Sequence, residues 1–507
     1  MAVNIEFNPV IPPLPKFEDK TKIDIRYGLL PPLSYAHIYW DKEKSEMIYE
    51  VEEPVLSEED KNNLKMLEDG FKEVINIDML SEKTVSGVLD YIEKTAKTLI
   101  AELNLKISNE SYEKIVYYLF RNFVGLNEIE PIIRDYYIED IECNGLNTPL
   151  YVIHRVYRNM RTNISYRDIE NLASFVEKLA QKCGRYISYA NPLLDGTLPD
   201  GSRVNATYTK DITSRGPTFT IRKFTKIPWT PTQLISMHTV APEMFAYLWM
   251  LVQYKSNIMI AGGTASGKTT LLNSIAFFIP PEARVVSIED TRELNLPREN
   301  WIPSVARTAM GTKKIGEVDL FDLLKNSFRQ NPEYVIVGEV RGKEAFVLFQ
   351  GMASGHASIS TMHADSVDAV IRRLQTPPIE LSPSLINSLD VLAVQTHAIA
   401  NKQETRRLRM ITEIINVTPE GKATTVSPFI WNPVDDRFYF KRESKVFGKI
   451  SARYGIPIQE LYREFDRRTM LLSAMAEQKV FGFDEFQKEI NEYYKNPSGV
   501  LAKYGIE

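Results

Sequence analysis

Residues 262–269 read GGTASGKT, which matches the spacing G-x-x-x-x-G-K-[ST] of phosphate-binding loops. An apolar run at 257–261 precedes the segment, and apolar residues at helical spacing (Leu271, Leu272 and Ile275) follow it. Glycine lets consecutive backbone N–H groups turn toward an anion, and the helix N-terminus adds positive potential. This strand–loop–helix order therefore predicts a nucleotide site.

One continuous loop is predicted to hold the nucleotide. Lys268 is placed to bridge the β- and γ-phosphates, and the Thr269 hydroxyl is placed to bind Mg²⁺. We expect ATP, because NKQE at 401–404 has glutamate where the guanine-reading N-K-x-D motif has aspartate, and because this polar segment follows no apolar strand. The predicted nucleotide ligands are Gly262, Gly263, Thr264, Ala265, Ser266, Gly267, Lys268, Thr269 and Thr270.

Two further apolar runs end in carboxylates. RVVSIED at 284–290 ends in Glu289 and Asp290, and YVIVGE at 334–339 ends in Glu339. The carboxyl ends of central parallel strands meet at one edge, so we expect both glutamates to face the γ-phosphate. We predict that Glu289 polarises the attacking water and that Glu339 supports Mg²⁺, directly or through water. Asp290 is a further candidate ligand, and the assignment of the base to one glutamate stays open.

A histidine pair flanks the small strand in GHASISTMHADS at 355–366. We expect His356 and His363 to sense the terminal phosphate by hydrogen bonding. Zinc binding is the weaker interpretation, because no cysteine or further histidine lies nearby in the sequence.

The first half of the chain predicts an N-terminal α+β domain. Residues 1–33 are proline-rich and are expected to form an irregular arm, which either lies on its own domain or binds a partner. Residues 34–223 are expected to form the domain itself, with a helical part at about 57–124 and a mixed α+β part at about 128–223. Ser57, with Asp60 three residues on, predicts the start of the first helix.

The second half of the chain has a different order of predicted elements. Residues 224–232 (FTKIPWTPT) concentrate proline and threonine and are expected to form a linker. From 233 to 507, strands and helices alternate, which predicts a parallel sheet covered by helices. From about 446 the chain is mostly helical and charged.

Composition limits the classes of protein that fit. The chain has 507 residues and a net charge of −5, so its overall charge does not attract nucleic acid. It has two cysteines, Cys143 and Cys183, which excludes a disulfide framework. We see no secretory signal and no apolar run of membrane-spanning length. We expect a cytoplasmic protein, peripheral to the inner face of the cell membrane.

With these motifs in order, the chain resembles the secretion ATPase superfamily of type II secretion, type IV pilus and archaellum motors. GGTASGKTT is similar to its Walker A motif, SIEDTREL to its Asp box, RQNPEYVIVGEVRGKEA to its Walker B motif and GHASISTMHADS to its His box. Upstream, IEDIECNG, LPDGSRVNA and SRGPTFTIRKF resemble segments of its N-terminal domain. The resemblance covers residues 128–373, about half of the chain.

The resemblance implies an α/β fold, with a RecA-like P-loop motor domain around a parallel sheet and a mobile α+β N-terminal domain. It implies a homo-oligomer, usually a hexamer, with ATP between the domains. It also implies a polytopic membrane platform protein, other cytosolic motor-complex proteins and contact with phospholipid, and no nucleic acid. By resemblance, Arg215 and Arg222, with Arg203 as a further candidate, reach the nucleotide from the N-terminal domain.

One departure favours a branch of the superfamily. Bacterial type II secretion and pilus assembly members commonly carry a tetracysteine insert after the His box, whereas this chain has no cysteine there. This favours the archaeal branch, and the archaellum motor above all. Two rival functions remain, a conjugation-type or nucleic-acid translocating ATPase and a nucleotide-gated scaffold without turnover. The cluster of Arg406, Arg407 and Arg409 fits a nucleic-acid contact, a subunit contact or a solvated face.

Overall fold

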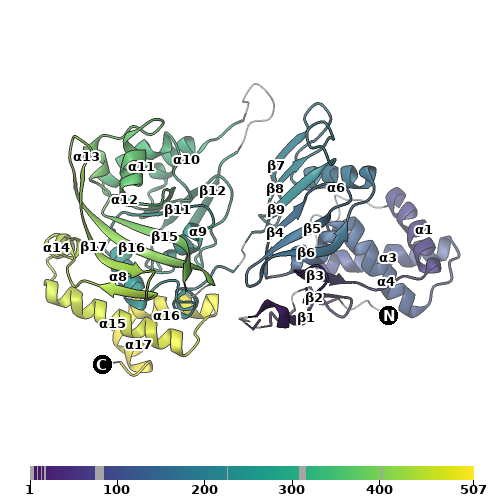
Figure 1. The fold of residues 1–507 in the computed structure, drawn as a ribbon, viewed down its shortest axis with the longest axis horizontal. Coiled ribbons are helices and arrows are strands. Elements are labelled where there is room, and N and C mark those ends of the chain that lie inside the picture. Colours follow the sequence, from purple (N-terminus) through teal and green to yellow (C-terminus); the bar gives the residue numbers. More distant parts are fainter. Residues whose placement is uncertain are drawn as a thin grey trace. The chain divides into compact units, whose positions relative to one another are not determined.

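The chain folds as two units, Met1–Phe224 and Thr225–Glu507, each built on its own sheet (Figure 1). The structure is a computed structural model and describes residues 5–7, 9–12, 14–15, 19–74, 85–224, 227–307, 316–400 and 403–506. The division between the units falls after the first residue of the predicted linker at 224–232.

A nine-stranded sheet forms the centre of the first unit, counted over the described residues. Its order is β1-β2-β3-β6-β5-β4-β9-β8-β7, and its pairs are antiparallel except for a short parallel contact between β3 and β6. The strands are β1 (Asp24–Leu30), β2 (Ser34–Asp41), β3 (Glu46–Glu52), β4 (Ile138–Cys143), β5 (Pro149–His154), β6 (Arg158–Ser165), β7 (Leu193–Thr197), β8 (Arg203–Thr207) and β9 (Thr218–Arg222).

The helices of this unit belong to two hydrophobic clusters. The amphipathic helix α6 packs its buried face, which includes Phe175 and Leu179, on the sheet. The helices α1, α3 and α4 share a second, smaller cluster. The bounds are α1 (Glu58–Val74), α3 (Val85–Glu102), α4 (Asn109–Leu119), α5 (Glu130–Arg134) and α6 (Ile169–Lys182).

The predicted start of α1 is confirmed. The Asp60 backbone N–H donates to Ser57 Oγ at 3.1 Å, and the Ser57 N–H donates to Asp60 Oδ2 at 3.2 Å. These reciprocal bonds satisfy backbone donors that would lack a partner at a helix N-terminus.

The prediction of an irregular arm over residues 1–33 is wrong for its last part. Residues 24–30 form strand β1, which pairs antiparallel with β2. Tyr27 and Leu29 are buried against the sheet core, and Leu30 is buried in the cluster of α1, α3 and α4, so the last part of β1 is buried on both sides. Two prolines directly after the strand and the lack of strict alternation hide it in the sequence.

The described part of the remaining arm lies on its own unit, which was one of the two alternatives. Ile5 is buried in the cluster of α1, α3 and α4. The Tyr157 hydroxyl donates to the Pro15 carbonyl at 2.7 Å, and the Tyr137 hydroxyl donates to the Pro12 carbonyl.

The second unit has a sheet with the order β12-β11-β13-β14-β10-β15-β16-β17-β18. The first six strands are parallel, which confirms the predicted parallel sheet, and the ribbon from β15 to β18 is an antiparallel extension that was not predicted. The strands are β10 (Ile258–Gly262), β11 (Val285–Glu289), β12 (Trp301–Val305), β13 (Tyr334–Val337), β14 (Ala357–His363), β15 (Val391–Ala400), β16 (Gln403–Val417), β17 (Ala423–Asn432) and β18 (Arg437–Phe440).

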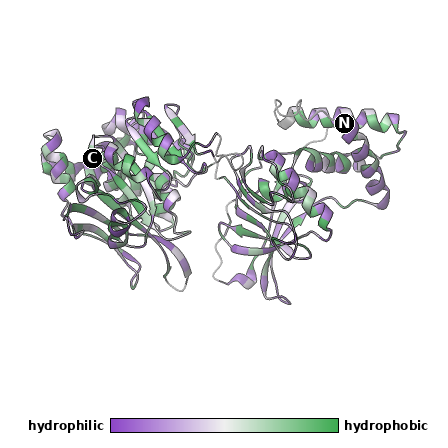
Figure 2. Cartoon of the chain, turned by 90° about the horizontal axis from the view of Figure 1, so that it is seen from above, coloured by the Kyte–Doolittle hydropathy of each residue, from purple (hydrophilic) through white to green (hydrophobic). Residues whose placement is uncertain are grey.

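Helices cover both faces of this sheet (Figure 1). On β10, Ile258 and Ile260 belong to the cluster of α8, α9, α15 and α16, while Met259 and Ala261 belong to the cluster of α10, α11 and α12. Figure 2 shows the hydrophobic colouring gathered on these central strands. The helices are α7 (Pro231–Ser236), α8 (Pro242–Gln253), α9 (Lys268–Ala276), α10 (Leu320–Ser327), α11 (Glu344–Ala353), α12 (Val367–Gln375), α13 (Pro383–Ile386), α14 (Lys445–Tyr454), α15 (Ile458–Glu477), α16 (Phe483–Lys495) and α17 (Pro497–Lys503).

The NKQE segment at 401–404 differs in context from the prediction. It follows strand β15, whose first five residues are buried, and its last two residues begin β16. Asn401 and Lys402 lie outside the described residues.

The predicted helical tail is present, and a buried carboxylate holds its first helix. Glu413 on β16 is fully buried and accepts hydrogen bonds from the Tyr247 hydroxyl at 2.6 Å and the Ser444 hydroxyl at 2.5 Å. It also accepts from the backbone N–H groups of Lys445 at 2.7 Å and Val446 at 3.3 Å, at the start of α14. Negative charge at a helix N-terminus is favourable.

We expect Glu413→Ala to destabilise the second unit by about 3 kcal/mol, because four donors lose their acceptor and two of them, on Tyr247 and Val446, belong to buried residues. Denaturant unfolding measures this loss, and Glu443→Ala, at an exposed position nearby, is the control. Equal stability of the two variants would contradict the anchoring role of Glu413.

Candidate nucleotide site

The strand register brings the predicted motifs to one edge of the second sheet. Gly262, the last residue of β10, lies opposite His363, the last residue of β14. Val337, at the end of β13, lies opposite Ser360 on one side and Ile288 on the other. The carboxyl ends of β10, β11, β13 and β14 therefore meet, as expected for neighbouring parallel strands.

The loop between β10 and α9 has the backbone of a phosphate-binding turn. Ala265 and Gly267 have positive φ values of 55° and 96°, and α9 begins directly at Lys268. The Lys268 ammonium donates to the Gly263 carbonyl at 2.8 Å, and the Ser266 hydroxyl donates to the same carbonyl at 2.9 Å. Burial lowers the pKa of Lys268. The lysine thus lies within the loop that it is predicted to serve.

Glu289 is buried at the end of β11, with 2% of its surface exposed. Its Oε1 accepts from the backbone N–H groups of Glu293 and Leu294, both at 2.9 Å, while its buried Oε2 has no hydrogen-bond partner among the described residues. Burial raises the pKa of Glu289 to about 7, although the two N–H bonds act in the opposite direction. A carboxyl of this kind exchanges a proton near neutral pH and keeps one oxygen for a donor such as water.

Gly338 explains why glycine precedes Glu339. A Cβ at this position would lie 3.0 Å from Glu289 Cγ, which is closer than nearly all real contacts. The Thr361 hydroxyl on β14 donates to the Gly338 carbonyl at 2.6 Å, and the Gly338 N–H donates to Ile288 on β11 at 2.9 Å. The glycine gives Glu289 room between two fixed strands.

Glu339 differs from Glu289 in its environment. The Arg341 guanidinium donates to Glu339 Oε2 at 2.8 Å and to Asp290 Oδ2 at 3.4 Å. Burial raises the pKa of Glu339, but the bond and charge of Arg341, with His363 and Lys268, outweigh it and leave the pKa below its usual value. Arg341 was missed in the sequence, where the signal was an arginine two residues after the acidic strand end.

Oxygen donors at this edge fit a magnesium ion. Thr269 follows Lys268 in the first turn of α9, and Asp290 and Glu339 follow the ends of β11 and β13 at the same edge. Mg²⁺ prefers a few oxygen ligands and keeps several waters, so a hydroxyl with one or two carboxylates suits it. Among the described residues, no group of three or more His, Cys, Asp and Glu side chains could hold a metal ion by itself.

The two histidines do not converge. His363 Nε2 lies 3.4 Å from the Thr264 hydroxyl, so it borders the loop, and burial lowers its pKa. His356 precedes the first residue of β14, at the opposite end of a seven-residue strand, about 20 Å away. Its ring packs against Phe328 at 4.8 Å. The prediction that His356 senses a phosphate at the same loop is therefore wrong, because a parallel strand carries its two ends to opposite edges.

The predicted arginines lie in the first unit. Arg222 on β9 pairs with Asp140 at 3.2 Å, and Arg203 on β8 pairs with Asp195 at 3.0 Å. Arg203 and Arg222 are opposite each other across β8 and β9, and Arg215 is exposed in the loop before β9. Their contact with the nucleotide stays a prediction.

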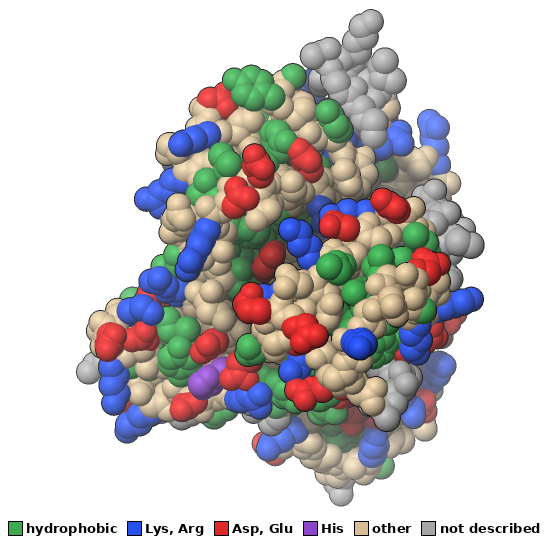
Figure 3. Space-filling view, turned by 90° about the vertical axis from the view of Figure 1, so that its right-hand side faces the viewer, with side chains coloured by type: hydrophobic (Ala, Val, Ile, Leu, Met, Phe, Trp, Pro, Cys, Tyr) green, Lys and Arg blue, Asp and Glu red, His purple; other side chains and the backbone are tan. Residues whose placement is uncertain are grey.

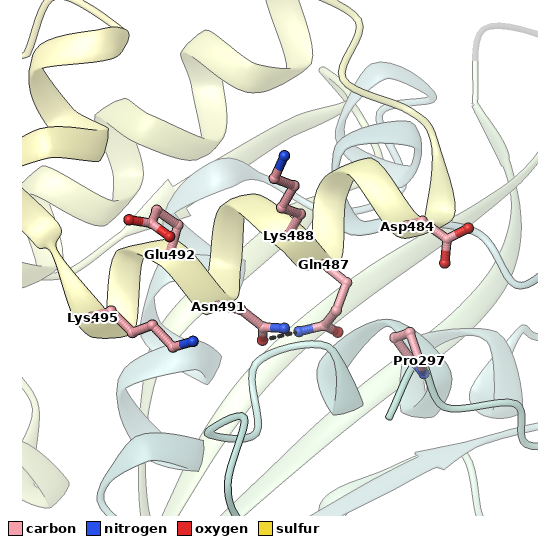
Figure 4. A pocket seen from close by; sticks show the side chains of 7 residues that line it. All are labelled: Pro297, Asp484, Gln487, Lys488, Asn491, Glu492 and Lys495. Atoms are coloured by element: carbon pink, nitrogen blue, oxygen red, sulfur yellow. Dashed lines mark hydrogen bonds between the residues drawn. The ribbon is translucent and has the colours of Figure 1, made fainter. Parts of the chain in front are cut away.

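A hollow of about 340 Å³ lies elsewhere in the second unit, over α16 (Figure 4). Its lining side chains carry both charge signs and do not converge, and Gln487 donates to Asn491 at 2.7 Å. Figure 3 shows the same mixture of basic and acidic side chains over a whole face of the molecule. Among the described helices, none is both long and apolar enough to cross a membrane.

Comparison with known proteins assigns the family. The type II/IV secretion system proteins match residues 127–426. The chain belongs to this family. Its second unit has an α/β fold with a phosphate-loop motif at residues 262–269, and the family match covers parts of both units.

Two relatives illustrate the range of the family. The uncharacterized protein MJ0900 of Methanocaldococcus jannaschii is 39% identical over 78% of this chain and 72% of its own length. The type IV secretion system protein PtlH of Bordetella pertussis is 31% identical over 47% of this chain and 80% of its own. Among solved structures, the Legionella pneumophila ATPase DotB is 16% identical, with a TM-score of 0.40, over 71% of this chain and 92% of its own.

The raised pKa of Glu289 predicts a pH-dependent stability. Below its ordinary value of 4.5 the proton is bound in both states, and as the pH rises toward about 7 only the folded state keeps it. The contribution of Glu289 to the free energy of unfolding is therefore fully present below its pKa in the unfolded chain. It is lost as the pH rises through the pKa of Glu289 in the folded protein, and the total loss is about 3 kcal/mol.

Thermal unfolding without nucleotide, followed from about pH 5 to about pH 8, measures this effect. Wild type should lose stability relative to Glu289→Gln over that window. Parallel profiles for the two proteins would show that Glu289 titrates normally.

Proposed function

We propose that this chain is the ATP-hydrolysing ring motor of an archaellum or type IV pilus-like filament and drives a polytopic membrane platform protein. The convergence of Lys268, Glu289 and Glu339 at one sheet edge carries the catalytic part of the proposal. Family membership, which includes parts of both units, supports the motor part. The lack of cysteine after the His box supports the archaeal branch, in which the archaellum motor is our first choice.

The loop would bind ATP through its backbone N–H groups, and Lys268 would exchange the Gly263 carbonyl for a phosphate oxygen. Thr269 and Glu339 would hold Mg²⁺, which neutralises charge on the phosphates when bound. Arg341 keeps Glu339 ionised at neutral pH, as a metal-supporting carboxylate must be.

Glu289 is our choice for the base. With a pKa of about 7 it binds a proton more tightly than Glu339 does, and its Oε2 lacks a partner among the described residues. It would accept a hydrogen bond from the attacking water and take its proton as the water oxygen bonds to the γ-phosphorus and the bond from that phosphorus to the bridging oxygen of ADP breaks. His363, beside Thr264, would report the presence of that phosphate.

ATP hydrolysis would drive movement of the first unit relative to the second, with the linker as the hinge. We propose a hexamer, in which the first unit closes on ATP and contributes Arg215 and Arg222, and then reopens after product release. The chain would work in the cytoplasm at the inner membrane face, with phospholipid and other motor-complex proteins around it. The molecular mass of the assembly in solution, measured with and without ATP, tests the proposed hexamer.

Single substitutions separate the two glutamates. Glu289→Gln should lower kcat by at least about 100-fold and leave ATP binding unchanged, because it removes a general base. Glu339→Gln should mainly raise the Mg²⁺ concentration needed for half-maximal rate. Phosphate release measured against ATP and Mg²⁺ gives both values, and Lys268→Ala should abolish turnover. Near-normal kcat in Glu289→Gln would exclude it as the base.

A conjugation-type translocase is the second candidate, because the conjugal transfer protein TrbB of Rhizobium radiobacter is 30% identical over 45% of this chain. The filament motor should be stimulated by phospholipid vesicles and not by DNA. ATPase rates measured with each additive decide between the two. Stimulation by single-stranded DNA alone would favour the translocase.

A further inference from the structure

The arginine cluster on β16 separates into three environments. Arg407 is buried and donates to both carboxylate oxygens of Asp436, at 2.9 Å and 3.0 Å. Arg409 is exposed. Arg406 extends to the phosphate loop, where its Nε donates to the Ala265 carbonyl at 3.0 Å. Adjacent strand residues point to opposite faces, so Arg406 and Arg407 serve different neighbours.

A second residue of the β15–β16 ribbon borders the same loop. Gln395 lies opposite Gly262 in the register of β15 and β10, and a Cβ on Gly262 would lie only 2.5 Å from the Gln395 carbonyl oxygen. The Gln395 side chain lies beside Gly267, with Nε2 3.6 Å from where a Cβ on Gly267 would be. It is 3% exposed, and its buried Oε1 has no hydrogen-bond partner among the described residues. The β15–β16 ribbon therefore packs against one side of the phosphate loop.

Ala265 needs such support. Its φ of 55° is disfavoured for a residue with a Cβ, so the loop holds this shape only where its surroundings fix it. A loop that turns its N–H groups toward an anion leaves carbonyls on its outer side, and these need donors of their own. The Gly263 carbonyl accepts from Ser266 and Lys268 within the loop, whereas the Ala265 carbonyl accepts a charged bond from another strand.

We propose that Arg406 is a positioning residue for the nucleotide, an inference that rests on the proposed ATP-binding function of the loop. From the β15–β16 side it holds Ala265 in the left-handed conformation and so keeps the loop in its phosphate-binding form, while Gln395 supports Gly267 from the same side. Arg406 acts through the loop and not on the reacting atoms. Bound phosphate itself fixes the loop, so Arg406 matters for capturing the nucleotide and much less for turnover at saturation.

Substitution of Arg406 in the full chain tests this role. Arg406→Ala should raise the KM for ATP and the Kd for ADP by about tenfold, because a charged hydrogen bond to the loop is lost. Its kcat at saturating ATP should stay within about twofold of wild type. Arg406→Lys should recover part of the affinity, since an ammonium can donate to one carbonyl without the planar shape of a guanidinium. Arg409→Ala, three residues along the same strand, is the matched control.

The split between KM and kcat separates positioning from a merely structural role. A higher KM with normal kcat, partial recovery with lysine and a normal control support the proposal. An unchanged KM in Arg406→Ala, or an equal rise in Arg409→Ala, overturns it. A lower kcat at unchanged KM also overturns it, because that result places Arg406 in the transition state. If Arg406→Ala fails to fold, Arg406→Lys and Arg406→Gln provide the comparison, and wild-type KM in both counts against the proposal.

Discussion

The parallel register of β10, β11, β13 and β14 is the constraint on which the site depends. Side chains that follow neighbouring parallel strands must lie close together, since hydrogen bonds fix the strands less than about 5 Å apart. Lys268, Glu289, Glu339 and His363 come from four separate segments of the chain, and this register brings them to one edge. The same register excludes His356, which precedes β14 at the opposite edge.

The two glutamates differ in their surroundings, and their pKa values shift in opposite directions. Glu289 lies under the edge, where loss of solvent raises its pKa to about 7. Glu339 lies one strand away, paired with Arg341, and its pKa is below the usual value. Gly338 lies beside Glu289, and a Cβ there would come within 3.0 Å of Glu289 Cγ, so a larger residue would press on the Glu289 side chain. The glycine in VIVGE thus bears on the position of the Glu289 side chain.

The sequence predicts those features of the site that depend on local pattern. The phosphate loop and the acidic strand ends are contiguous motifs, and alternation of strands and helices indicates the parallel sheet. Three features depend on packing between distant segments and could not be predicted from local pattern. These are the burial of Glu289, the pairing of Arg341 with two carboxylates and the reach of Arg406 to Ala265.

The errors have physical causes of the same kind. His356 and His363 are close in sequence, but an extended strand separates its ends by about 3.3 Å per residue. Strand β1 is followed directly by Pro31 and Pro32, and its buried residues do not alternate strictly, so the segment lacks the usual strand pattern. The ribbon from β15 to β18 includes polar stretches, which are compatible with an antiparallel sheet that faces solvent on one side.

An experimental structure of Glu289→Gln with ATP and Mg²⁺ tests the central claim most directly, because the variant should bind nucleotide without consuming it. The account predicts the γ-phosphate between Lys268 and His363, with Glu339 on the metal side and an ordered water at the side chain of residue 289. A γ-phosphate away from this edge, or an attacking water held by Glu339 alone, would contradict it.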